Sequence, residues 1–397
     1  MTATLSDTIS DSLAATLRRS AALEAAIERD AGPFRILTGD RPTGPLHVGH
    51  YFGTVANRVR LQDLGAEVFV LIADYQVLTD RDNAEHLRAY VTGLVLDYLA
   101  CGIDPGRCVI FAHSAVPALN QLLLPFLSLV SVPELQRNPT VKEEITHSRQ
   151  SSVSGLMFTY PVHQAADILF CKANLVPVGQ DQLPHVEVTR LVARRFNERY
   201  GPVFPVPEAL LSSAPLLLGT DGGKMSKSRG NAIALGASSD ETARLLRGAK
   251  TDPIRRISYD QAARPEVSSL LLLAALAASS DETARLIRGA RTDSIRAVSY
   301  EPDARPEVSS LVLLAALAAD RDPDLLASEI GAGGAARLKA VATEAVNERL
   351  APIRARREHL AADLGYIRQV LLDGNDRARQ IAEATLADVR AAMGMRY

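Results

Sequence analysis

The feature that constrains this chain most is the stretch from Arg35 to Tyr51, RILTGDRPTGPLHVGHY. Ile36 and Leu37 begin an apolar strand that runs into a turn rich in Gly and Pro, and His47 and His50 follow where a helix can begin. A strand, a tight loop and a helix N-terminus in this order are typical of a site for nucleotide phosphates. We therefore expect the chemistry of the protein at this stretch.

The pattern around this stretch predicts an α/β fold. From residue 34 onward strand and helix patterns alternate, with apolar runs such as EVFVLIAD (67–74) and RCVIFAHS (107–114) between helical segments. Such alternation predicts a doubly wound parallel sheet, covered by helices on both faces, with ligands at the carboxyl ends of its strands. A more helical stretch at about 114–165 is expected as an insertion between two halves of the sheet.

Three parts follow from this reading of the 397 residues, a length that suits two domains. Residues 1–33 are predicted as an N-terminal helical extension and residues 34–232 as a Rossmann-like catalytic domain. Residues 233–397 are predicted as an all-helical C-terminal domain.

The C-terminal part contains a tandem duplication. Residues 238–278 recur at a 41-residue offset as residues 279–319, and nine positions differ. Each copy is expected to form a helix capped at its Ser-Asp start and a second, apolar helix after Pro265 or Pro306. A neutral duplication and a functional insert both remain open.

Composition narrows the class of protein. The chain is 47% hydrophobic and 23% charged, as globular proteins are, and its net charge of −2 means that an RNA partner would need local basic patches. Cys101, Cys108 and Cys171 lack the paired spacing of zinc sites and favour buried thiols in a reducing cytoplasm. Because the N-terminus has no basic start before an apolar core, and apolar runs are short, neither secretion nor membrane insertion is expected.

His47 and His50 could also be metal ligands. No HExxH glutamate accompanies them and no third ligand is evident, so we predict no metal site. Phosphate binding is the better interpretation, because Gly39, Gly44 and Gly49 allow close approach of a ligand and two imidazoles can donate to phosphate oxygens.

A second glycine-rich loop, GTDGGKMSKSRGN (219–231), contains Lys224 and Lys227. The Walker spacing fails, because Leu218 stands where Gly is required and Met225 where Ser or Thr is required. Lysines on such a loop can act as point charges toward a polyphosphate, although a solvated loop is the alternative for this segment alone.

The ordered pair of HVGH after the first strand and KMSKS after the last resembles the class I aminoacyl-tRNA synthetases. These enzymes activate an amino acid with ATP, release pyrophosphate and transfer the aminoacyl group to tRNA. YPVHQAADILF (160–170) and LVPVGQDQLPHVEVTR (175–190) are similar to the tryptophanyl-tRNA synthetase family, which implies a tryptophan–tRNA ligase. Tyrosyl-tRNA synthetase, a tRNA-independent nucleotidylyltransferase and a non-catalytic paralogue are the alternatives.

The resemblance also implies roles for individual residues. Tyr160 and Gln182 match positions that hold the substrate amino group, Asp167 matches the acceptor of the indole N–H, and Gly179 and Asp181 match a ribose-binding turn. The implied catalytic residues are His47, His50, Lys142, Lys224 and Lys227. The implied ATP-binding residues are Arg41, Pro42, Thr43, Gly49, His50, Gly179, Gln180, Asp181, Lys224, Met225, Ser226, Lys227 and Ser228. The implied tryptophan-binding residues are Gly39, Arg41, Gln76, Tyr160, Gln164, Asp167 and Gln182.

Three of these residues depart from the commonest bacterial pattern. Arg41 stands where Gln is usual, Gln76 where His is usual and Gln164 where Met is usual, similar to an auxiliary bacterial form of the enzyme. We hypothesise that they confer tolerance to indole-mimicking inhibitors.

The expected ligands and partners follow from the same resemblance. ATP with Mg²⁺ would be a substrate complex, with no tightly bound cofactor. L-tryptophan, tRNA(Trp) and a second copy in a homodimer are the expected partners, with no membrane and no DNA, in the cytoplasm.

Overall fold

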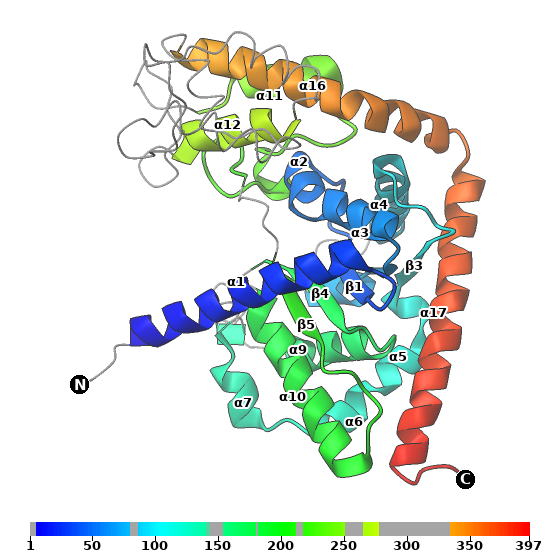
Figure 1. Ribbon diagram of the computed structural model, residues 1–397. Coiled ribbons are helices and arrows are strands. Elements are labelled where there is room, and N and C mark those ends of the chain that lie inside the picture. Colours follow the sequence, from blue (N-terminus) through cyan, green and yellow to red (C-terminus); the bar gives the residue numbers. More distant parts are fainter. Residues whose placement is uncertain are drawn as a thin grey trace. The chain divides into compact units, whose positions relative to one another are not determined.

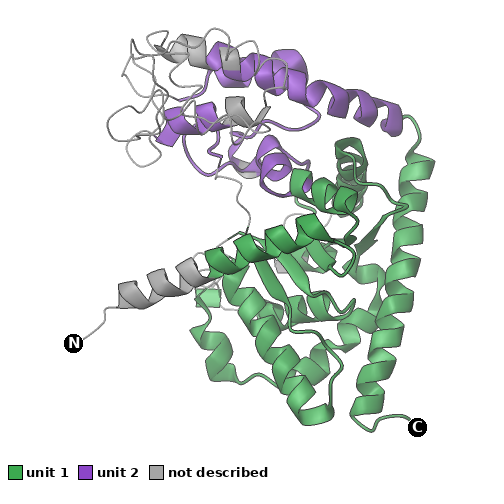
Figure 2. Cartoon of the chain, in the orientation of Figure 1, with its two compact units in different colours: residues 1–44, 56–213, 362–397 green, residues 45–55, 214–361 purple. Residues whose placement is uncertain are grey.

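The computed structural model describes residues 5–79, 86–139, 141–142, 154–179, 182–211, 217–250, 265–277 and 334–397. The chain forms two compact units, which Figure 2 shows in different colours. The first contains residues 1–44, 56–213 and 362–397, and the second contains residues 45–55 and 214–361. The units differ from the domains predicted above, because a short early segment belongs with the second unit and the C-terminal helix belongs with the first.

The first unit is built on a parallel sheet of five strands in the order β3-β2-β1-β4-β5. The strands are β1 (Arg35–Asp40), β2 (Glu67–Ile72), β3 (Cys108–Ala112), β4 (Leu175–Val178) and β5 (Glu208–Leu211). All registers are parallel, with Arg35 opposite Glu67, Val68 opposite Cys108, Ile36 opposite Leu175 and Leu175 opposite Glu208. The predicted doubly wound fold is confirmed.

Side chains on both faces of the sheet are buried. Leu37, Phe69 and Phe111 belong to a core that includes residues of α5, α6, α9, α10 and α17. The intervening Ile36 and Val68 are equally buried. Helices therefore cover both faces, which explains why the strands are continuous apolar runs rather than alternating ones.

The helices of the first unit follow the predicted alternation (Figure 1). They are α1 (Leu5–Arg29), α3 (Ala56–Leu64), α4 (Leu87–Cys101), α5 (Pro117–Gln121), α6 (Leu123–Leu127), α7 (Val132–Arg137), α9 (Gly155–Leu169), α10 (Leu183–Tyr200) and α17 (Leu364–Ala392), with 3₁₀ turns η2 (Asp74–Thr79) and η3 (His113–Ala115). The predicted N-terminal helix is confirmed as α1. No helix among the described residues combines the length and the apolar character needed to span a bilayer.

No strand was predicted at the position of β5. Its four residues, EALL, lack β-branched and aromatic side chains, so their intrinsic preference for a strand is weak. The strand forms through its pairing with β4. It is also held by α1, because the Ser20 hydroxyl accepts a hydrogen bond from Leu211 N–H at 3.0 Å.

Helix α17 covers the opposite edge of the sheet. Asn375 Oδ1 accepts a hydrogen bond from Ala112 N–H of β3 at 2.9 Å, and Arg377 donates to the Cys108 carbonyl at 3.3 Å. A Cβ atom on Gly374 would lie 1.8 Å from the Ile110 carbonyl oxygen, so only glycine allows this approach. The helix thus satisfies backbone groups that an edge strand would otherwise expose.

The second unit contains α2 (Val48–His50), the π-helical turn η1 (Tyr51–Val55), η5 (Lys227–Arg229), α11 (Ser239–Arg247), α12 (Pro265–Ala277) and α16 (Gly334–Ala361). Helices α11 and α12 come from the first copy of the duplication, and both pack against α16. Ser238 caps α11 by accepting from Glu241 N–H at 3.1 Å, and α12 begins at Pro265, as predicted. The second copy, 279–319, lies outside the described residues.

A buried ion pair joins β1 to α3, and a hydrogen bond from α4 reaches the same carboxylate. Arg58 of α3 donates to Asp40 Oδ2 at 2.6 Å, and the Tyr98 hydroxyl of α4 donates to the same oxygen at 2.6 Å. Burial opposes the charge on Arg58, but the carboxylate of Asp40 outweighs it and raises the Arg58 pKa. The side chain of Arg58 is 2% exposed, so this pair is held in a low-dielectric interior.

We predict that Arg58→Met lowers the free energy of unfolding by about 3–5 kcal/mol, because it leaves the Asp40 carboxylate without its buried counter-ion. Arg60→Met on the same helix is the matched control, because Arg60 pairs with Glu24 at 2.7 Å where both side chains are about one third exposed. That variant should lose less than about 1 kcal/mol. Urea unfolding measures the free energy of unfolding of both variants. Equal losses of stability would contradict the role of Arg58 as the buried counter-ion of Asp40.

Candidate active site

The carboxyl ends of β1 and β4 mark the place where the sheet reverses its strand order. These strands are neighbours, yet β1 leads to β2 on one side and β4 leads to β5 on the other. In open α/β sheets ligands bind in the crevice at such a point. The loop after β1 begins with Arg41, Pro42 and Thr43, and the loop after β4 begins with Gly179. Gln180 and Asp181, the next two predicted residues, lie outside the described residues.

The first signature, HVGH (47–50), folds as the start of α2 in the second unit. His47 is the N-cap residue, and its backbone N–H donates to His50 Nδ1 at 3.2 Å. Because Nδ1 is the acceptor, a neutral His50 bears its hydrogen on Nε2. His50 can therefore donate from Nε2 to an anion, which is the chemistry predicted for it.

The second signature, KMSKS (224–228), lies beside the first within that unit. Val48 N–H donates to the Ile233 carbonyl at 3.0 Å, and Leu235 N–H donates to the Leu46 carbonyl at 2.9 Å. A Cβ atom on Gly49 would lie 3.2 Å from Met225 Sδ. Two segments about 180 residues apart in the sequence thus meet through backbone pairing and a glycine contact.

Asn231 holds the loop of the second signature in place. Its Oδ1 accepts from Ser226 N–H at 2.8 Å, while its Nδ2 donates to Asp221 Oδ1 at 2.7 Å and to the Lys224 carbonyl at 3.1 Å. The hydrogen bonds that Asp221 accepts from Asn231 and from Gly223 N–H lower its pKa. Lys224 is exposed at the surface of this loop, and Lys227 begins the turn η5.

In the first unit, helix α9 brings three predicted residues onto one face. Tyr160, Gln164 and Asp167 are spaced four and three residues apart, which aligns them along the helix. The Tyr160 hydroxyl lies 3.1 Å from His185 Nε2 of α10. Gln182 is the N-cap residue of α10, and its N–H donates to the Gly179 carbonyl at 3.1 Å.

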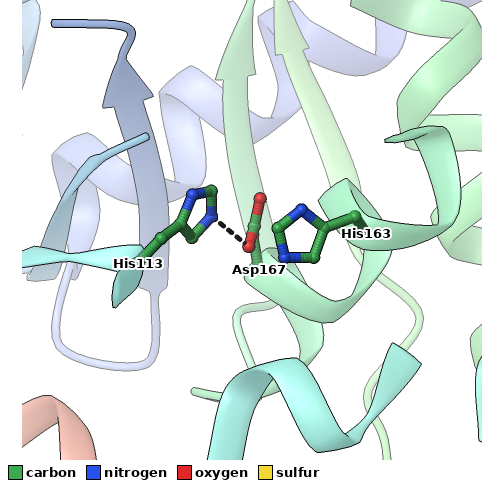
Figure 3. Close-up of side chains that lie close together, drawn as sticks. All are labelled: His113, His163 and Asp167. Atoms are coloured by element: carbon green, nitrogen blue, oxygen red, sulfur yellow. Dashed lines mark hydrogen bonds and ion pairs between the residues drawn. The ribbon is translucent and has the colours of Figure 1, made fainter. Parts of the chain in front are cut away.

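Asp167 belongs to a buried histidine–aspartate cluster with His113 and His163 (Figure 3). His113 Nε2 lies 2.5 Å from Asp167 Oδ1, and both side chains are at most 1% exposed. The second oxygen, Asp167 Oδ2, is buried and has no hydrogen-bond partner within the described part of the chain. Burial works against a charged His113, but Asp167 outweighs it and, with Asp74, raises the His113 pKa.

His163 is the neutral member of this cluster. Burial lowers its pKa, and the neighbouring His113 adds to that effect against the opposing influence of Asp167. Asn120 Nδ2 donates to the carbonyls of His113 and Val116, so its Oδ1 is the acceptor that faces His163 Nε2 at 2.8 Å. His163 therefore bears its hydrogen on Nε2 and donates it to Asn120 Oδ1.

The cluster has the donor types of a metal site, since two imidazoles and a carboxylate lie with their ligand atoms within 4.8 Å of one another. Ligands about 2.0–2.1 Å from a tetrahedral zinc ion are separated by roughly 3.3 Å. His113 Nε2 and Asp167 Oδ1 are only 2.5 Å apart, which is the distance of a hydrogen bond. An ion could enter this site only after that bond had broken.

The remaining predicted residues lie on several different elements. A Cβ atom on Gly39 would meet the Leu71 carbonyl oxygen at 2.7 Å, so the packing of β1 against β2 requires glycine here whatever binds nearby. Gln76 lies in the turn η2, Lys142 is exposed, and Ser228 lies in η5.

Sequence reasoning missed His113 and Asn231. His113 directly follows the buried strand β3, the position at which α/β sheets place ligand-binding side chains, and that signal was available. Asn231 gave no such signal, because an Asn after a Gly is common in any loop.

Comparison with known proteins agrees with this geometry. The sequence pattern of the class I tRNA synthetases (W and Y) matches residues 29–284. A tryptophan–tRNA ligase of Treponema pallidum is 41% identical over 365 residues, which cover 91% of this chain and 97% of the relative. A tryptophan–tRNA ligase of Thermotoga maritima is 50% identical over 225 residues, covering 56% and 68%.

The comparison with solved structures also finds a tryptophanyl-tRNA synthetase. Tryptophanyl-tRNA synthetase from Campylobacter jejuni, in a complex with ADP and tryptophan, matches with a TM-score of 0.70 and 26% identity over 91% of this chain and 99% of that one. The chain therefore belongs to the class I tRNA synthetases of the tryptophan and tyrosine branch. Within that branch, the curated relatives described above are both tryptophan–tRNA ligases.

We predict that Asn231→Ala loosens the loop of the second signature, because Ser226 N–H and the Lys224 carbonyl lose their partner. Amide hydrogen exchange across residues 219–231 should accelerate at least about tenfold, as expected when hydrogen bonds of roughly 1 kcal/mol each are removed. Asp221→Asn keeps an acceptor for Asn231 and is the matched control. Unchanged protection in Asn231→Ala would contradict this role.

Proposed function

We propose that this chain is a tryptophan–tRNA ligase. It activates L-tryptophan with ATP, releases pyrophosphate and transfers the aminoacyl group from tryptophanyl-adenylate to tRNA(Trp). Its relatives support the assignment, and the observation that carries it is Asp167 Oδ2, which is buried and has no hydrogen-bond partner among the described residues.

A buried carboxylate oxygen without a partner is costly unless a ligand supplies a donor. The indole N–H of tryptophan is one such donor, and it would bind on the same face of α9 as Tyr160 and Gln164. Gly39, Arg41, Gln76 and Gln182 complete the proposed tryptophan-binding set. A side chain that brings no donor to Oδ2 would leave the oxygen unsatisfied, which is how such a site excludes similar amino acids.

ATP-binding residues are proposed in each unit: both signatures in the second, and the loops after β1 and β4 in the first. His50 donates from Nε2 toward phosphate, while His47, Lys224, Lys227 and Lys142 supply further donors and positive charge. The remaining proposed ATP contacts are Arg41, Pro42, Thr43, Gly49, Gly179, Gln180, Asp181, Met225, Ser226 and Ser228.

Positioning and charge stabilisation account for the activation step. The substrate carboxylate is itself the nucleophile, so no side chain needs to act as a general base. Magnesium arrives with ATP, bound mainly through the phosphates.

A homodimer is the proposed assembly, in the cytoplasm. Leu124 of α6 is 76% exposed and Val132 of α7 is 57% exposed, which suits a surface that a second copy covers. Two arginines of the C-terminal helices form hydrogen bonds within the protein: Arg354 donates to Thr242 Oγ1 at 2.8 Å, and Arg379 donates to the Ala115 carbonyl at 3.3 Å.

We predict that the protein exchanges pyrophosphate into ATP when L-tryptophan is added, and that Asp167→Asn raises the KM for tryptophan about 10- to 100-fold. The amide oxygen of Asn would face His113 and its NH₂ would meet the indole N–H, a donor against a donor, at a cost of about 1.5–3 kcal/mol. The KM for ATP should stay within a factor of about two.

The chain contains no tryptophan, so the fluorescence of added tryptophan reports binding directly. Exchange driven by tyrosine and not by tryptophan would overturn the proposed substrate. Adenylate formation without charging of any tRNA would instead indicate a nucleotidylyltransferase.

A further inference from the structure

His113 is buried beside the proposed substrate contact, yet the activation chemistry described above makes no use of it. It is the first residue after β3 and begins the turn η3, with no exposed side-chain surface. Its partner Asp167 lies 54 residues further along the chain, on α9. A contact between such distant segments in a dry site has to serve either stability or substrate selection.

The position of His113 is fixed from several sides. The next residue, Ser114, donates its backbone N–H to Asp74 Oδ1 at 3.0 Å, and its hydroxyl donates to the other oxygen of that carboxylate. The ring of Tyr75 stacks on the imidazole, with centroids 6.2 Å apart. Asn120 holds the carbonyl of His113 at 3.4 Å. The imidazole is therefore a rigid donor.

The hydrogen bond from His113 makes the two oxygens of Asp167 different. Oδ1 is bonded to His113 Nε2, and Figure 3 shows the other oxygen on the side away from that contact. A carboxylate held by one oxygen cannot rotate freely about its bond to the chain. The other neighbour, His163, donates its Nε2 hydrogen to Asn120 and therefore not to Asp167 Oδ2.

We propose that His113 is a positioning residue for amino-acid selection: by holding Oδ1 of Asp167, it leaves Oδ2 as a single, oriented acceptor for a ring N–H. The proposal rests on the proposed function, because it assigns a second residue to the same substrate contact. His113 touches Asp167 and not the reacting atoms, so its effect falls on discrimination between substrates.

The decisive quantity is the ratio of kcat/KM for tryptophan to that for β-(benzothiophen-3-yl)alanine, in which sulfur replaces the ring N–H. Pyrophosphate exchange gives this ratio for each variant. The unaltered protein should prefer tryptophan by about 10- to 100-fold, the loss expected when a buried acceptor is left unpaired.

His113→Phe keeps a ring but removes the donor, so Asp167 can rotate or take up a proton, and the ratio should fall to within about threefold of unity. His113→Gln restores an N–H at a similar reach and should recover most of the ratio. A ring that served packing alone would give the opposite order, because Phe fills the site better than Gln.

Gln62→Leu is the matched control for stability. Gln62 is buried, accepts from Asp104 N–H at 2.8 Å and donates to the Gly102 carbonyl at 3.3 Å, both outside the cluster. It should lower the melting temperature and leave the ratio unchanged. A ratio in His113→Phe equal to that of the unaltered protein would overturn the proposal, whereas absence of any exchange with tryptophan in the unaltered protein would instead overturn the proposed function.

Discussion

The parallel pairing of β1 with β2 on one side and β4 on the other is the constraint on which the rest of the structure depends. It sets two carboxyl ends next to each other and sends their loops in opposite directions. The loop after β1 leads within a few residues to the first signature. Helix α9, which brings in Asp167, ends just before β4. Strand order therefore fixes where the candidate residues of the first unit lie, and their side chains add the chemistry.

Burying a charged side chain costs free energy, and the fold compensates this cost differently at Asp40 and at Asp167. Asp40 is neutralised by Arg58 and accepts from Tyr98, so a carboxylate can stand at the end of a buried strand. Asp167 receives one donor from His113 and is left one donor short. In the first arrangement the carboxylate charge is balanced by a buried guanidinium of the same protein, which suits a structural role. The second is proposed to be completed by one donor of a bound ligand, which suits recognition.

Most of the sheet could be predicted because long apolar strands and helical periodicity are local signals. Strand β5 could not, because EALL is a strand only through its pairing with β4. The grouping of residues 45–55 with residues 214–361 was also beyond local patterns, since it depends on backbone pairing between Leu46 and Leu235. The two signatures were found by their residue types, whereas the hydrogen bond from His113 to Asp167 arises from tertiary packing of β3 against α9.

Recognition of tryptophan, as proposed above, depends on a single oxygen of Asp167 that accepts the ring N–H. Tryptophan labelled with ¹⁵N in the indole ring tests it most directly, because the chain has no indole of its own and the bound ligand gives the one indole N–H signal in the spectrum. The claim predicts that this proton moves downfield on binding and exchanges slowly with water, and that Asp167→Asn abolishes the shift. A bound tryptophan whose N–H keeps its free chemical shift and exchanges rapidly with water would contradict it.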